Sequence, residues 1–91
     1  MKQLFEIKQT TDLINQTRRS NLYAKLEIQV LEWAYDKIKT HGRSMGEYKI
    51  RARLTKLQEK QASKEIMAFA TKPARAKQIN ALKWVVDEGE I

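Results

Sequence analysis

The sequence of 91 residues contains no cysteine and only one histidine, His41. Without cysteine the chain can form neither a disulfide framework nor a thiolate zinc site, which is typical of a reducing compartment and predicts a cytoplasmic location. A single imidazole offers little to a histidine-based metal site or a Ser-His-Asp triad, and His41 itself fits the last turn of a helix. We therefore expect a protein that is not an enzyme and that needs no metal and no cofactor.

Long apolar runs are missing as well. The N-terminal segment carries Lys2, Glu6 and Lys8 where the apolar part of a signal peptide would lie. No uninterrupted apolar run approaches the roughly 18 residues of a membrane-spanning helix, so we expect no membrane partner. A phosphate-binding loop, a zinc-protease motif and an EF-hand loop are also absent, and the residues match no family signature.

Glycine and proline are scarce, with three glycines and one proline in the chain. Long stretches without these residues, rich in Lys, Glu, Gln, Leu and Ala, favour helix over strand. We predict an all-α fold: a small single-domain helical bundle over residues 1–91, with a long central helix and a basic second long helix. At the ends, residues 1–11 are either a short helix or a flexible arm, and residues 87–91 are expected to form a frayed acidic tail.

The spacing of apolar residues places the helices. Residues 22–40 are predicted to form the most buried helix, because apolar side chains cover about half of its circumference. Trp33 in this segment is expected in the core or at its edge. Before it, Thr10 or Thr11 is a candidate cap for a helix that starts near Asp12.

Residues 41–46 form the clearest connection. Gly42 suits the left-handed position that ends a helix. Ser44 is then a candidate cap for the next helix, with Glu47 completing a capping box.

The helix after this connection is expected to run past Lys60, and its apolar face then shifts around the helix. Either the helix breaks near residues 61–63, with Ser63 as a new cap, or, as we favour, it continues and its last part packs from a different side. The members of that second apolar face are Ala62, Ile66, Phe69 and Ala70.

Pro73 suits the first turn of the last helix. One face of this helix is apolar and consists of Ile79, Leu82, Val85 and Val86. Trp84 points away from that face. It is either an interface residue, which would allow a homodimer, or a side chain that folds back over the edge of the domain.

Positive charge is concentrated in one part of the chain. Ten basic and three acidic residues lie between Arg43 and Lys77, so this stretch accounts for the whole net charge of +7. Within it, five cations recur at spacings of three or four residues, which align side chains on one helix face. This basic stripe consists of Lys49, Arg53, Lys56, Lys60 and Lys64.

The basic stripe is either a binding surface or a solvated helix face. A solubilising face normally mixes both signs, whereas anions are almost absent here. The leading hypothesis is a small regulator that binds the phosphate backbone of nucleic acid through this stripe, helped by Arg43, Arg75 and Lys77. The absence of aromatic residues within the stripe argues against base stacking with a single strand.

The alternative to nucleic acid is an acidic partner protein, docked on the same basic face by an inhibitor or adaptor, for example one encoded by a phage or other bacterial element. A helix-turn-helix is disfavoured because the predicted connection is longer than the roughly three or four residues of that motif. The second helix is also basic along its length and not only at its N-terminal end.

Overall fold

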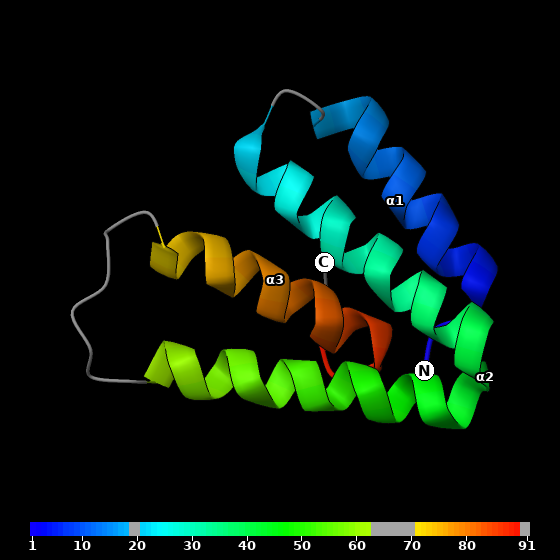
Figure 1. Ribbon diagram of the computed structural model, residues 1–91. Coiled ribbons are helices and arrows are strands. Elements are labelled where there is room, and N and C mark those ends of the chain that lie inside the picture. The colour runs from blue at the N-terminus through cyan, green and yellow to red at the C-terminus, as the bar shows by residue number, and fades with distance from the viewer. Residues whose placement is uncertain (19–20, 63–70, 90–91) are drawn as a thin grey trace.

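The computed structural model describes residues 1–18, 21–62 and 71–89, and these residues form three α-helices (Figure 1). Helix α1 spans Leu4–Arg18, α2 spans Leu22–Ala62 and α3 spans Thr71–Val85. No strand occurs in this part of the chain, which confirms the predicted all-α class and the long central helix. None of these helices is long and apolar enough to cross a membrane.

Helix α2 bends at Gly42, where φ is 84° and ψ is 173°. This backbone region is essentially restricted to glycine. The bend divides α2 into a first arm, residues 22–41, and a second arm, residues 43–62, which folds back beside it (Figure 1). A glycine turn at this position was predicted, but the expected connection over residues 41–46 is wrong, because helix resumes directly after Gly42.

The direct bend changes two details of the prediction. Glu47 does not complete a capping box with Ser44, because its Oε1 accepts hydrogen bonds from Nε and Nη2 of Arg51 at 3.3 and 3.1 Å. The connection before the second arm is also not longer than the turn of a helix-turn-helix, contrary to the prediction. The connection is shorter than that motif needs, so the motif is disfavoured for the opposite reason.

Gly46 brings the two arms of α2 into backbone contact. A Cβ atom at this position would lie 2.8 Å from Cα of Ile38 and 3.1 Å from its backbone nitrogen. Real side chains do not approach a backbone this closely, so only hydrogen fits there. Gly46 therefore serves the close approach of the arms, a role different from the place in a connection that the sequence suggested.

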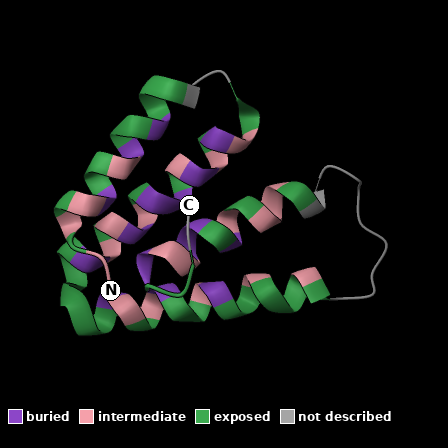
Figure 2. Ribbon diagram, turned by 180° about the vertical axis from the view of Figure 1, so that it is seen from behind, coloured by how far each residue is buried: buried purple, intermediate pink, exposed green. Residues whose placement is uncertain are grey.

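The core lies where α1 and α3 pack against α2. Helix α3 lies between the two arms, and α1 lies on the outer side of the first arm (Figure 1). Purple segments in Figure 2 mark the buried faces that these helices turn toward one another. The apolar face predicted for the last helix is confirmed, because Ile79, Leu82, Val85 and Val86 are all buried.

The N-terminal segment is folded. Residues 4–11 belong to α1, and Ile7 is completely buried, a contact that stabilises the fold by roughly 1.5–3 kcal/mol. The flexible-arm alternative is therefore wrong for these residues. Thr11 does not cap a helix that starts near Asp12, since it lies inside α1 and its Oγ1 donates a 2.7 Å hydrogen bond to the carbonyl of Ile7.

The C-terminal acidic residues hold the two ends of the chain together. The Asp87 carboxylate lies 2.7 Å from the Met1 ammonium and 3.0 Å from Nζ of Lys2. The Glu88 carboxylate lies 2.6 Å from Nη1 of Arg51 on the second arm. A frayed acidic tail was expected over residues 87–91, of which Asp87 and Glu88 make these contacts and residues 90–91 lie outside the described residues.

Residues 63–70, between α2 and α3, lie outside the described residues. Helix α2 ends at Ala62, and Pro73 lies in the first turn of α3, as predicted. Ile66, Phe69 and Ala70, which were expected to form a second apolar face, lie outside the described residues.

We expect Gly46→Ala to destabilise the protein. Overpacking against the Ile38 backbone costs about 1–3 kcal/mol. This cost exceeds the roughly 0.8 kcal/mol that alanine gains over glycine inside a helix. Denaturant unfolding measures the difference, with Ser44→Ala, an exposed change two residues away, as a control within about 0.5 kcal/mol of wild type. A Gly46→Ala variant as stable as wild type would show that the arms do not touch here.

The ion pair between the chain ends should weaken in acid. Hydrogen bonds from the Met1 ammonium and then from Lys2 lower the pKa of Asp87 below its ordinary value of 3.8. A carboxyl group with a lowered folded-state pKa stabilises the fold above the unfolded-state value, and this contribution is lost as pH falls through the folded-state pKa. The melting temperature advantage of wild type over Asp87→Asn should therefore be present at pH 6 and shrink below about pH 4.

Asp36→Asn is the matched control for this experiment, because it removes the same charge from an exposed position on the first arm. It should not reproduce the pH-dependent difference. Equal melting curves for wild type and Asp87→Asn at pH 6 would contradict a stabilising role for the ion pair.

Candidate nucleic-acid interface

A groove of about 480 Å³ lies between the two arms of α2. Trp33 and Lys37 line it from the first arm, and five residues line it from the second. The second-arm residues are Tyr48, Lys49, Ala52, Arg53 and Lys56. We call this site the basic groove, because four of its seven residues are cations and none is acidic.

An Arg–Trp contact joins the two sides of the basic groove. The guanidinium carbon of Arg53 lies 4.5 Å from the centroid of the Trp33 ring, and Nζ of Lys37 lies 5.9 Å from the same centroid. Contacts at these distances are cation–π interactions, worth about 0.5–2 kcal/mol. Partial burial lowers the pKa of the Arg53 guanidinium, which still remains charged at neutral pH. Trp33 itself is partly buried against the core, as predicted.

Three cations of the groove have no internal counter-charge. Within the part of the chain that the structure describes, Lys37, Lys49 and Lys56 form no ion pair with an acidic side chain. Arg51, which precedes the groove residue Ala52 in the sequence, is paired with acidic side chains instead. The hydrogen bonds that Arg51 donates to Glu88 and then to Glu47 raise its pKa, and the two carboxylates neutralise its charge within the fold. Arg51 therefore adds little to the positive charge that the groove cations present.

Tyr48 belongs to the site, although it was not among the site residues predicted from the sequence. Its side chain is 71% exposed, and it lies next to Lys49 and one turn before Ala52. No aromatic residue lies within the basic stripe of the sequence, but in the folded protein Tyr48 and Trp33 line the groove beside its cations. Tyr48 directly precedes Lys49 on the same helix, so the sequence alone could have indicated that it lies beside the basic stripe. Trp33 belongs to the first arm, and only the fold brings it to the groove.

The structure gathers part of the basic stripe in the groove. Lys49, Arg53 and Lys56 line it. Lys60 is exposed in the last turn of α2, beyond the groove lining. Lys64 lies outside the described residues. The stripe is thus a groove wall over its first two turns.

The other predicted cations lie elsewhere. Arg43 donates hydrogen bonds to the Met1 carbonyl at 2.9 Å and to Oε1 of Gln3 at 3.0 Å, so it holds the N-terminal segment against α2. Arg75 and Lys77 are carried by α3 and do not line the groove.

Trp84 is partly buried against the core, with Nζ of Lys2 lying 5.4 Å from its ring centroid. These contacts correspond to the alternative in which Trp84 folds back over the edge of the domain. Its role as an interface residue stays a prediction.

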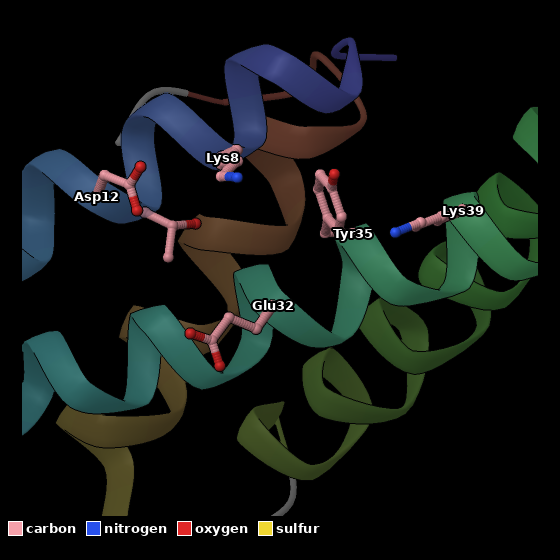
Figure 3. A pocket seen from close by; sticks show the side chains of 6 residues that line it. Lys8, Asp12, Glu32, Tyr35 and Lys39 are labelled. Carbon is pink, nitrogen blue, oxygen red and sulfur yellow. The ribbon is translucent and has the colours of Figure 1, made fainter.

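A second cavity, of about 330 Å³, lies between α1 and the first arm of α2. Figure 3 shows the carboxylates of Asp12 and Glu32 in the same cavity as the amines of Lys8 and Lys39, with Tyr35 between the two lysines. Because the two signs balance, this cavity offers no net attraction to a polyanion. No three potential metal ligands cluster within residues 1–18, 21–62 and 71–89.

Comparison of the chain with protein-family models, with curated proteins and with solved structures finds no match in any of the three. The function must therefore be argued from the chemistry of the groove.

Proposed function

We propose that this protein is a small non-enzymatic regulator that binds nucleic acid through the basic groove. The observation that supports the proposal is the convergence of four cations from both arms of α2 on one concavity without an acidic residue. A polyanion is the ligand that such a surface attracts most strongly, since each phosphate contact adds Coulomb attraction and releases a counterion.

The intramolecular pairing of charges supports the same site. Arg43 and Arg51 are engaged with the N-terminal segment and with acidic residues, so neither depends on a partner. Lys49 and Lys56, and Lys37 beside the Trp33 ring, form no ion pair with an acidic side chain of the described residues, so their charges are available to a ligand. Lysines contact phosphates as point charges, which gives affinity with little sequence preference. The proposal includes a cytoplasmic location, as the lack of cysteine suggests.

The alternative is an acidic partner protein that docks on the same surface. The exposed ring of Tyr48 favours it, because tyrosine is enriched among the residues that contribute most to protein interfaces. In that case groove mutations should slow association with the partner protein and leave nucleic-acid binding unchanged.

We expect Lys49→Gln and Lys56→Gln each to weaken binding to a random-sequence duplex and to a thymidine oligonucleotide. Each substitution removes one phosphate contact, so the slope of log affinity against log salt should fall in magnitude by about 1. Fluorescence anisotropy titrations at several salt concentrations measure both quantities. Melting curves should stay close to that of wild type, because Lys56 is exposed and Lys49, although half-buried, forms no ion pair with an acidic side chain of the described residues.

Lys39→Gln is the charge-matched control, because Lys39 lines the cavity on the α1 side and not the groove. It should change affinity and salt slope less than either groove variant. An equal effect of Lys39→Gln would mean that net charge alone attracts the nucleic acid. Failure of wild type to bind either probe at low salt would refute the proposed function.

A further inference from the structure

The basic groove has the shape of a receptor for a flexible strand. It has a volume of about 480 Å³ and is open to solvent along one side, so a ligand can lie in it without being enclosed. Proteins that read duplex DNA directly insert a helix or a β-ribbon into its major groove. Here the protein surface is concave, so a protruding part of the ligand must enter the groove of the protein. An unpaired nucleotide can do this, whereas the bases of a duplex are held in its stack.

Tyr48 provides a surface for such a base. Its ring is 71% exposed, and its hydroxyl makes no hydrogen bond to any residue that the structure describes. Proteins that bind single strands combine a cationic groove with aromatic rings on which bases stack. Trp33 cannot serve in the same way on the face that Arg53 covers at 4.5 Å.

The residue order along the second arm leaves space beside the Tyr48 ring. Tyr48, Ala52 and Lys56 follow one another at intervals of four residues, so they lie in one column on the helix. Ala52 is exposed and small, and the space above its methyl group is open. The column therefore presents a ring, a gap and a cation within about 12 Å of helix.

The geometry points to single-stranded nucleic acid as the ligand of the basic groove. One unpaired base stacks on Tyr48 above Ala52, and the adjoining phosphates contact Lys49 and Lys56. The inference rests on the proposed function and adds the strandedness of the ligand and the residue that selects it. Arg53, held against Trp33, supplies a further phosphate contact from the floor of the groove.

Three substitutions test this arrangement without changing any charge. Tyr48→Ser removes the ring, Tyr48→Phe keeps it, and Ala52→Leu fills the gap beside it. The probe is a thymidine oligonucleotide of about 12 nucleotides, within the range of known single-strand sites, and a duplex of equal length is the comparison. Both positions are exposed, so melting curves of all three variants should match wild type.

Tyr48→Ser should weaken single-strand binding about 5- to 150-fold, the range for loss of one aromatic stacking contact. Tyr48→Phe should bind like wild type, and Ala52→Leu should weaken binding although every cation is retained. Affinity for the duplex should stay within about twofold for all three, because the phosphate contacts are unchanged. As a second measurement, wild type should quench an oligonucleotide that carries 2-aminopurine more strongly than saturating Tyr48→Ser does.

The outcomes separate this inference from the proposed function. If wild type binds neither probe, both are wrong. If Lys49→Gln weakens binding but Tyr48→Ser and Ala52→Leu leave the single-strand affinity and the quenching unchanged, the groove binds phosphates without stacking. The inference is then overturned while the proposed function stands.

Discussion

The contact between Gly46 and Ile38 is the constraint on which the rest of the structure depends. Two helical arms separated by one non-helical residue, Gly42, can lie against each other only if their backbones approach closely near the bend. A side chain at position 46 would separate them at their narrowest point. Because the arms then diverge away from the bend, the distance set there fixes where α3 packs and how wide the basic groove is (Figure 1).

The charges of the chain are divided between two roles by this geometry. Arg43, Arg51 and Lys2 hold the termini and the bend through short contacts with acidic groups and backbone carbonyls. Such exposed pairs are individually weak, but several that share the same elements restrict the ends of a small fold. The cations that face the groove make no such contacts within the described residues, and their mutual repulsion is a cost that a bound polyanion would remove.

The two aromatic residues of the groove also differ in whether they make internal contacts or remain exposed. Trp33 is fixed in the core edge and orients Arg53, whereas Tyr48 is exposed and has space beside it. An oriented guanidinium loses less conformational entropy when it binds a phosphate, and an exposed ring can exchange water for a base. The proposed preference for single strands follows from this pairing of a fixed cation with an available ring.

Local information in the sequence determined the helical class, the glycine at the bend, the proline at the start of α3 and the apolar face of α3. Each of these depends on the backbone preference of single residues or on spacing within one helix. Only the tertiary structure decided that Trp33 meets Arg53, that Gly46 serves a close approach, and that Asp87 and Glu88 are held by distant cations. These contacts join residues 8 to 86 positions apart, and their geometry depends on the angle of a bend that no local pattern specifies.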